Sequence, residues 1–506
     1  MYKTLCDKVP EDRDFPARTR RLIARGEFLD GKLYDRLMYS FADERDAQNK
    51  YVPIRERRPS VRYNLSKIIV NDSVSMLFGD NHFPAIEVQS DGETDNTALN
   101  ETYAKLVKDL QLSSVFVDLA TNGSIGSVAL WLRVLSARVY FKVMRTAYLT
   151  PTFDPEKPNV VTKMREQYKV TGRELRERGY SLPPNQDDTR YWFRREWDAI
   201  AEIWFEPWKV AEPVDFTPRP DLTRSTTHKL GFCPFLWVRN LPSEDELDGG
   251  CTFDDGGGVP DTQIQIEYQL SQSGRGLSYS SQPTLVIQDD NTKPDSIVAG
   301  DAIQIPTTGD AKLLEIDGNA SNAVIEYCRF LREMALEVGG GNRVDASKLS
   351  TAASGRAIEM MNQALIWLAS KLRVTYGEGA LLDALNMIAR VSQKIALTYK
   401  DGTPVGKLDT SKPLTLKWPD WCAPTVEDKM NQATAVKTLR EAHVISVKTA
   451  VNIVAPTYDI ENVDEEVKEV TAERDANAER EAAVKIAGAA APGKPPAKGT
   501  QRAKAR

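Results

Sequence analysis

The chain has few of the patterns by which metal-binding proteins are recognised. It has only three histidines in 506 residues, His82, His228 and His443, and they form no HExxH pair or other zinc-ligand spacing. The five cysteines are scattered without a CxxC pair, which argues against a zinc ribbon or disulfide framework and indicates reduced thiols. We therefore expect no metal site and no bound cofactor.

Motifs for phosphate binding and nucleophilic catalysis are also missing. The Gly-Lys pairs at 31–32, 406–407 and 493–494 are followed by Leu, Leu and Pro, so the GxxxxGK[ST] loop of P-loop ATPases does not occur. The run Gly-Ser-Ile-Gly at 123–126 has the wrong spacing for a GxSxG nucleophile elbow and predicts a tight turn before a strand. Adjacent carboxylates such as Asp254 and Asp255 lie in turn contexts. We expect no catalytic residues.

Long hydrophobic runs and a large charge imbalance are absent as well. The most apolar stretch, 128–135, contains Arg133 and is too short to span a bilayer. Acidic residues precede any apolar run at the N-terminus, which is unlike a secretory signal. The formal net charge of −6 excludes binding of nucleic acid by bulk charge but leaves room for local contacts. We expect a soluble protein made inside the cell, without a membrane partner.

The first half of the chain mixes helix and strand signals. Apolar spacing predicts a helix that ends at Gly79, which we expect in the left-handed conformation, and a second helix that ends before Gln111. Aromatic and β-branched runs predict strands at 139–143, 191–197, 200–205 and 231–240. A cluster of Gly and Asp at 248–258 predicts a boundary.

The sequence pattern that predicts secondary structure changes twice in the middle of the chain. Ile264, Ile266, Tyr268 and Leu270 alternate, and this pattern alone predicts a strand. Three β-rich runs then predict a small β module, at 284–288, 302–306 and 312–316. From residue 320 one apolar helical stripe is predicted, formed by Val324, Tyr327, Cys328, Leu331, Met334, Ala335 and Val338 and ended by glycines at 339–341.

The last third is predicted to be mainly helical. Ser354 is a suitable N-cap for a long helix to about residue 400, and Gly377 and Gly379 predict a kink within it. A strand at 414–418 and helices at 426–442 and 446–454 follow. The acidic segment 461–481 is typical of a solvated helix, and the basic tail 488–506 is typical of disorder.

Five segments, taken in order, resemble a known family. They are the helix and glycine at 64–79, the helix-to-strand passage at 121–130, the strand segment at 228–240, the helix start Ala-Ala-Ser-Gly-Arg-Ala-Ile-Glu-Met-Met at 352–361, and Trp-Pro-Asp-Trp-Cys-Ala-Pro at 418–424 before the Ile-Ser at 445–446. Together they span most of residues 60–470 and are similar to the portal proteins of tailed double-stranded DNA bacteriophages, the head-to-tail connectors of the virion. Their order and spacing carry the resemblance.

The resemblance implies an α+β portal fold with an α/β wing at 1–255. A first stem helix would occupy 256–280, so the resemblance favours helix where the alternating pattern favours strand. A small β-rich clip would follow at 281–318, a second stem helix at 319–338 and a tunnel loop at 339–353. The remaining regions would be a long kinked helix with a return to the wing at 354–425, crown helices at 426–487 and a disordered basic tail at 488–506.

The resemblance also implies a function without catalysis. Portal subunits form a homo-oligomeric ring, a dodecamer of about twelve copies, through a repeated head-to-tail interface. The ring sits at one capsid vertex of the virion, is assembled in the host cytoplasm, and is the channel for viral genome packaging and ejection. Its implied partners are the ATPase large subunit of terminase, the major capsid and scaffolding proteins, the head-completion adaptor and tail proteins, and double-stranded DNA that passes without sequence specificity. ATP hydrolysis would then belong to terminase.

Two sets of site residues follow from the resemblance. The DNA-proximal tunnel loop would present Asn342, Arg343, Lys348 and Ser350. Arg343 and Lys348 either contact phosphates in the lumen or pair with acidic neighbours such as Asp345 and Glu337. The clip would bind its protein partners through Thr284, Val286, Gln288, Ile303 and Ile305.

Two other functions remain open at this stage. The first is an α/β enzyme whose active site is unrecognised, because sites are built from residues distant in sequence. The second is a peripheral adaptor or scaffolding protein with long helices and a basic tail. An enzyme would be expected to gather titratable residues in one pocket, whereas a portal subunit would be expected to form rings.

Overall fold

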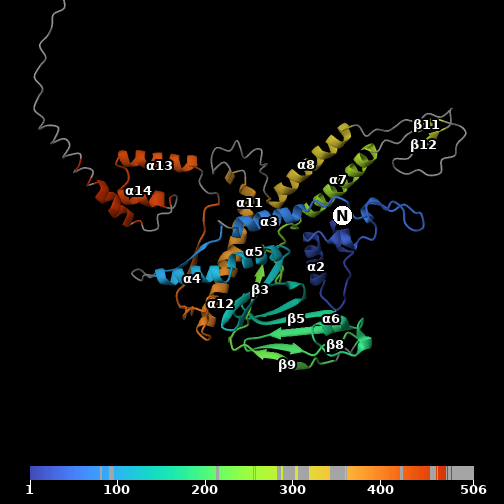
Figure 1. Cartoon of the computed structure of the whole chain (residues 1–506), viewed down its shortest axis with the longest axis horizontal. Coiled ribbons are helices and arrows are strands. Elements are labelled where there is room, and N and C mark those ends of the chain that lie inside the picture. Colours follow the sequence, from blue (N-terminus) through green and yellow to red (C-terminus); the bar gives the residue numbers. More distant parts are fainter. Residues whose placement is uncertain are drawn as a thin grey trace, which may run out of the picture. The chain divides into compact units, whose positions relative to one another are not determined.

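The computed structural model describes most of the chain: residues 1–79, 82–89, 96–211, 216–254, 256, 258–281, 286–288, 303–305, 318–341, 359–360, 362–421, 426–455, 458, 463, 465–474, 476 and 480. The chain forms two compact units, residues 1–345 with 361–421, and residues 346–360 with 422–506. Helices and antiparallel sheets occur together, as the α+β prediction requires (Figure 1).

The first unit begins with short helices that lead to a buried one. Helices α1 (Tyr2–Cys6) and α2 (Ala17–Leu29) precede the 3₁₀ turns η1 (Leu33–Arg36) and η2 (Ile54–Glu56). Helix α3 (Leu65–Phe78) starts where the Asn64 side chain accepts a hydrogen bond from the Lys67 amide. It stops at Gly79, as predicted, but the predicted left-handed conformation is wrong. Gly79 has φ −58° and ψ 167°, and a Cβ there would lie 2.5 Å from the Ser75 carbonyl oxygen.

Two more helices lead into the first sheet. Helix α4 (Thr97–Asp109) ends at the predicted break, where Gln111 is left-handed with φ 50°, and α5 (Leu112–Gly123) follows. The turn after Gly123 leads into β2 (Ser127–Leu135), as the sequence predicts. The antiparallel sheet has the order β10-β2-β3, with β3 at Arg138–Arg145 and β10 at Phe235–Arg239.

A six-stranded antiparallel sheet packs against this one. Its order is β4-β5-β6-β7-β9, and β8 pairs with β6. The strands are β4 (Leu149–Phe153), β5 (Val161–Thr171), β6 (Arg190–Trp197), β7 (Ala201–Phe205), β8 (Trp208–Lys209) and β9 (Pro220–Thr227). The turn η3 (Thr146–Tyr148) precedes β4, and α6 (Gly172–Glu177) and η4 (Pro184–Gln186) connect β5 to β6. Trp131, Trp197 and Phe235 pack together between the sheets. The predicted strands of this region are confirmed.

Part of the segment 248–258, which was predicted as a boundary, is folded into the core. Asp248 and Cys251 are almost fully buried. Asp248 accepts hydrogen bonds from Arg18 on α2 and from the Ser127 hydroxyl at the start of β2. The Gly and Asp residues allow the chain to turn, but the carboxylate ties α2 to the three-stranded sheet.

Two antiparallel helices follow. Helix α7 (Val259–Ser281) confirms the helix that the resemblance predicts, and the strand that the alternating pattern alone predicts is wrong. Helix α8 (Gly318–Gly339) runs beside it (Figure 1) and brings Gly339 next to Val259. Both helices pack on Leu65 and Ile69 of α3. Between them, β11 (Val286–Gln288) and β12 (Ile303–Ile305) form a parallel pair, and the third predicted run lies outside the described residues.

The long helix after residue 360 changes its winding at the predicted glycines. Helix α11 (Gln363–Leu372) continues into the π-helical segment η5 (Arg373–Leu381) and then α12 (Leu382–Ser392). A π-helical segment is a common origin of kinks. The predicted end near residue 400 is wrong, because the chain leaves the helix after Ser392 and buries Leu397 and Tyr399 in non-helical backbone. The predicted cap, Ser354, lies outside the described residues.

Gly377 is required by a close approach within η5. A Cβ at this position would lie 2.2 Å from the Trp418 ring, whereas a Cβ at Gly379 would meet only the Val374 carbonyl oxygen at 3.5 Å. We expect Gly377→Ala to lower the free energy of unfolding by about 1–3 kcal/mol through overpacking. Gly379→Ala is the matched control, and we expect it to be neutral or stabilising by up to about 1 kcal/mol. Urea unfolding of both variants followed by tryptophan fluorescence tests this difference, and equal effects would contradict it.

A long-range strand pair completes the first unit. Strand β1 (Ala85–Val88) pairs antiparallel with β13 (Leu414–Lys417), which confirms the strand predicted at 414–418. The main core lies under these strands and is formed by apolar residues of α2, α3, α5, β2 and α12.

The second unit contains α13 (Val426–Glu441) and α14 (Val447–Val454), the two predicted helices. Ser446 caps α14 through the Thr449 amide. The two helices contact each other, and the Gln432 side chain donates a hydrogen bond to the Ile453 carbonyl oxygen at 3.0 Å.

Candidate functional site

The two predicted interaction sites are described to different extents. Asn342, Arg343, Lys348 and Ser350 of the predicted tunnel loop lie outside the described residues, as does Thr284 of the predicted clip. The other four clip residues lie in the parallel β11–β12 pair. Val286 is opposite Ile303, and Gln288 is opposite Ile305. The structure therefore brings these four positions together.

Helix α8 has apolar residues on two faces. Val324, Cys328, Leu331 and Ala335 point toward α7 and α3 and belong to a buried cluster. Tyr327, Phe330, Met334 and Val338 are exposed, with Phe330 at 58%. The seven positions of the predicted stripe do lie within one arc of about 120° at 100° per residue. Helices α7 and α3 cover one border of this arc, and the other border is exposed.

The exposed residues of α8 follow the spacing of a helix interface. Tyr327, Phe330, Met334 and Val338 are separated by three, four and four residues, so they lie on one side of the helix. We call this set the open α8 face. Single apolar residues are common on protein surfaces. These four lie together, and a contiguous apolar patch is typical of an interaction site. The sequence contained this signal, but it could not show that α7 and α3 would leave these four side chains uncovered.

A second exposed apolar surface lies on the long helix. Trp367 and Val374 are each 64% exposed, and their spacing of seven residues places them on one side of α11 and the start of η5. Lys371 is exposed between them. We call these three residues the open α11 face. They were not among the predicted site residues.

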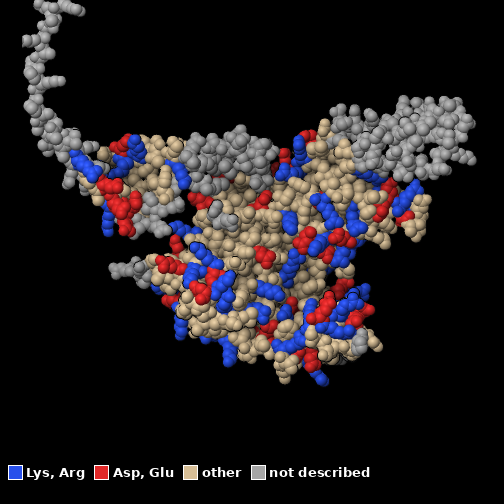
Figure 2. All heavy atoms as spheres, viewed as in Figure 1, with Lys and Arg blue, Asp and Glu red and all other residues tan. Residues whose placement is uncertain are grey.

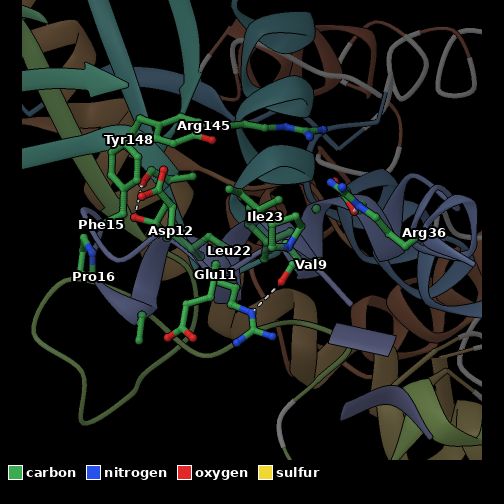
Figure 3. A pocket seen from close by; sticks show the side chains of 18 residues that line it. Val9, Glu11, Asp12, Phe15, Pro16, Leu22, Ile23, Arg36, Arg145 and Tyr148 are labelled. Atoms are coloured by element: carbon green, nitrogen blue, oxygen red, sulfur yellow. Dashed lines mark hydrogen bonds and ion pairs between the residues drawn. The ribbon is translucent and has the colours of Figure 1, made fainter. Parts of the chain in front are cut away.

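A cavity of about 570 Å³ lies between the N-terminal segment, α2 and the end of β3 (Figure 3). Val9, Leu22 and Ile125 give it an apolar lining. Among its lining residues there is no histidine, cysteine or serine, and Thr19 donates its hydroxyl to the Ala147 carbonyl oxygen at 2.8 Å.

The basic side chains of the cavity already have acceptors. Arg20 donates to the Val9 and Asp7 carbonyl oxygens, Arg36 pairs with Glu27, and Arg145 pairs with Asp30. These arginines are therefore held by partners within the chain, and the lining also carries the carboxylates Glu11 and Asp12.

The described residues hold few other chemical features. Within them there is no cluster of His, Cys, Asp or Glu that could hold a metal ion, and no helix with the length and hydropathy to cross a bilayer. Cys6, Cys233, Cys251 and Cys328 are free thiols, and burial raises the pKa of Cys233 and of Cys251 to about 12. Such thiols are poor nucleophiles. Acidic and basic side chains are interspersed over the face seen in Figure 2.

Neither a protein-family model nor a curated protein matches the sequence.

Proposed function

We propose that the chain is the subunit of a phage portal ring at a capsid vertex. One observation carries the proposal. Helix α8, which pairs with α7 on one side, keeps the four large apolar side chains of the open α8 face exposed on another. Burying such a face against a neighbouring subunit is favourable by about 25 cal/mol per Å² of apolar surface. A face that meets a different surface on the next copy produces a head-to-tail ring when the rotation closes.

The order of elements supports the same proposal. The portal resemblance calls for two stem helices separated by a small β-rich clip and followed by a long interrupted helix. Helices α7 and α8, the β11–β12 pair between them, and the α11–η5–α12 helix occur in this order. In this proposal the β11–β12 region binds terminase during packaging and head-completion proteins afterwards.

DNA would pass through the ring without tight binding. A channel that neutralised many phosphates would hold DNA strongly, because each neutralised phosphate releases counterions. The net charge of −6 suits a sliding channel with few basic contacts. The ring would belong to the virion, and terminase would supply the energy of packaging from ATP.

The proposal predicts rings of high mass that depend on the open α8 face. We expect the purified protein to have a native mass of about twelve times the 56.5 kDa chain and to show a central hole in negative-stain electron microscopy. The double variant Phe330→Asp, Met334→Asp is expected to be monomeric in light scattering, because charged groups cannot be buried unpaired at the interface. Leu222→Asp is the matched control, since Leu222 is exposed on β9 and its replacement should leave the rings intact.

Two results would contradict the proposal. One is a wild-type chain that remains a monomer or dimer at all concentrations and salts. The other is a double variant that assembles as well as the Leu222→Asp control.

A further inference from the structure

Three basic side chains on one face of the six-stranded sheet share a single carboxylate. Glu196 of β6 is 4% exposed, and its Oε2 lies 2.6 Å from Lys163 Nζ of β5. Its Oε1 accepts hydrogen bonds from Arg165 Nε at 2.9 Å and from Arg194 Nε at 2.8 Å. We call these four residues the Glu196 cluster. Three cations and one carboxylate give the cluster a charge of +2 at neutral pH.

The other end of the same sheet face is balanced within the chain. Side chains alternate between the two faces of a strand, so Lys169 of β5 lies on the same face as Lys163. Lys169 pairs with both Asp12 and Asp14 of the N-terminal segment. Arg190 is close enough to help to lower the pKa of Asp12. Two cations thus meet two carboxylates at this end, whereas the Glu196 cluster keeps an excess of positive charge.

The cations of the Glu196 cluster can still reach an external partner. The side chains of Lys163 and Arg165 are 42% and 44% exposed. Within the described part of the chain, the one hydrogen bond of Arg165 leaves from Nε, so both Nη groups remain open to solvent. Thr150 and Thr152 of β4 are exposed as well, and they lie opposite Arg165 and Lys163 in the strand register. The surface therefore offers hydrogen-bond donors and positive charge to an anion.

The composition of this surface favours a phosphate backbone over an acidic protein segment. Protein interfaces are usually centred on large aromatic or apolar side chains. Strands β4, β5 and β6, all of which are described, expose no large apolar side chain. Lysine, arginine and threonine are among the side chains that contact phosphate oxygens in protein–DNA complexes.

The aromatic rings on this face indicate a duplex rather than a single strand. Proteins that bind single strands stack the bases on open aromatic rings. Here Trp192 stacks on Trp208, with the ring centroids 6.3 Å apart, and Lys169 Nζ lies 5.0 Å from the Trp192 centroid. Phe205 is covered by the Arg194 guanidinium at 4.7 Å. The rings are therefore occupied within the chain. The phosphates of a duplex can be reached from outside, without an element that enters a groove.

We propose that the Glu196 cluster binds the phosphate backbone of double-stranded DNA without reading its sequence. Lys163 and Arg165 contact the phosphates, and Glu196 holds both side chains in place. This contact uses none of the residues 342–350 of the predicted tunnel loop. It lies within one chain, so it goes beyond the proposed channel and does not depend on ring assembly. The expected dissociation constant is that of non-specific binding, about 10⁻⁴–10⁻⁶ M at physiological salt.

Substitution of the two exposed cations tests the proposal. We expect Lys163→Gln, Arg165→Gln to weaken binding of a short fluorescent DNA duplex about tenfold at low salt. The slope of log K against log salt should become shallower by about 2, because each neutralised phosphate contributes about 0.9. Lys142→Gln, Lys400→Gln is the matched control, since it removes the same charge from two exposed positions elsewhere. Fluorescence anisotropy measures binding, and circular dichroism checks that each variant is folded.

Glu196→Gln is expected to act in the opposite direction. Loss of the carboxylate raises the charge of the cluster from +2 to +3, so the duplex should bind several times more tightly than it binds the wild type. Misfolding of the variant could not explain such a gain. A folded Glu196→Gln variant that binds no more tightly than the wild type would contradict the proposal.

Lysine acetylation gives a readout at the site itself. The duplex should protect Lys163 of the wild-type chain from acetic anhydride and leave Lys142 unprotected, as measured by mass spectrometry. Equal affinities of the cluster variant and its control, with Lys163 unprotected, would overturn the proposal. Protection by poly-glutamate but not by the duplex would assign the surface to an acidic protein instead. Tighter binding of a single strand of the same length would overturn the choice of a duplex. A chain that forms no rings would contradict only the portal proposal.

Discussion

Asp248→Ala is expected to lower the free energy of unfolding of the first unit by about 3–5 kcal/mol, as removal of one member of a buried ion pair does. Asp248 is 1% exposed, and both of its oxygens are used. Arg18 donates from Nε and Nη2 at 2.9 and 2.8 Å, and the Ser127 hydroxyl donates at 2.6 Å. Alanine would leave a largely buried guanidinium and a buried hydroxyl without this acceptor.

The matched control for this prediction is Asp245→Ala. Asp245 pairs with Arg21, which also reaches Asp248, but Asp245 is much more exposed. We expect its loss to cost no more than about 1 kcal/mol. Tryptophan fluorescence in urea is a suitable measurement, because all nine tryptophans lie in the first unit. All variants must be compared at one protein concentration, since assembly adds to apparent stability. Equal effects of the two substitutions would contradict the role of Asp248.

Glu267 is expected to make the folded chain less stable as the pH rises. Burial raises the pKa of this α7 carboxyl to about 7, although hydrogen bonds from Tyr34 and Gln263 act in the opposite direction. A raised pKa means that the folded state holds the proton more tightly than the unfolded chain. The stabilisation that the protonated Glu267 carboxyl gives to the folded state is therefore complete below about pH 4.5 and is lost as the pH rises through 7. The expected loss between pH 5 and pH 8 is up to about 3 kcal/mol.

Glu267→Gln should remove this pH dependence. Glutamine keeps the shape and can still accept a hydrogen bond from Tyr34, so the variant should be more stable than the wild type at pH 8 and similar to it at pH 5. Urea unfolding at both values measures the difference. Glu196→Gln is the control. Burial acts to raise the pKa of Glu196, but hydrogen bonds from Lys163 and Arg194 outweigh it and the pKa is lowered. The stability that the ionised Glu196 carboxylate contributes is lost only in acid. Glu196→Gln should therefore leave the difference in free energy of unfolding between pH 5 and pH 8 unchanged. A wild-type stability that is flat over this range would contradict the prediction for Glu267.

Helix α7 shows where sequence patterns are insufficient. Its alternating apolar residues predict a strand, yet Ile264, Ile266, Gln263 and Glu267 are all nearly fully buried. The helix is covered on several sides, by α8, α3 and the N-terminal segment, and therefore has no single apolar stripe. A residue such as Glu267 is read as solvent-facing from sequence, whereas Tyr34 and Gln263 satisfy it inside the core. Only the portal resemblance predicted the helix.

Several elements were predicted well. The strands near residues 139, 191 and 201 and the helices at 426 and 447 occur where the sequence patterns place them. The candidate contact surfaces were predicted poorly, because exposure depends on which face a neighbouring element covers. Tyr327 and Met334 were assigned to the same stripe as Cys328, and tertiary packing separates them.

The pairing of β1 with β13 has a consequence for how the chain matures on the ribosome. Ala85 pairs with Lys417, about 330 residues later, so β1 has no partner until nearly the whole first unit has been synthesised. At roughly 5–20 residues per second this delay lasts tens of seconds. The six-stranded sheet has no such delay, because its strands pair with near neighbours in sequence. During translation, Ile86 and Val88 thus form an open strand edge that a chaperone or a second nascent chain can reach before β13 covers it.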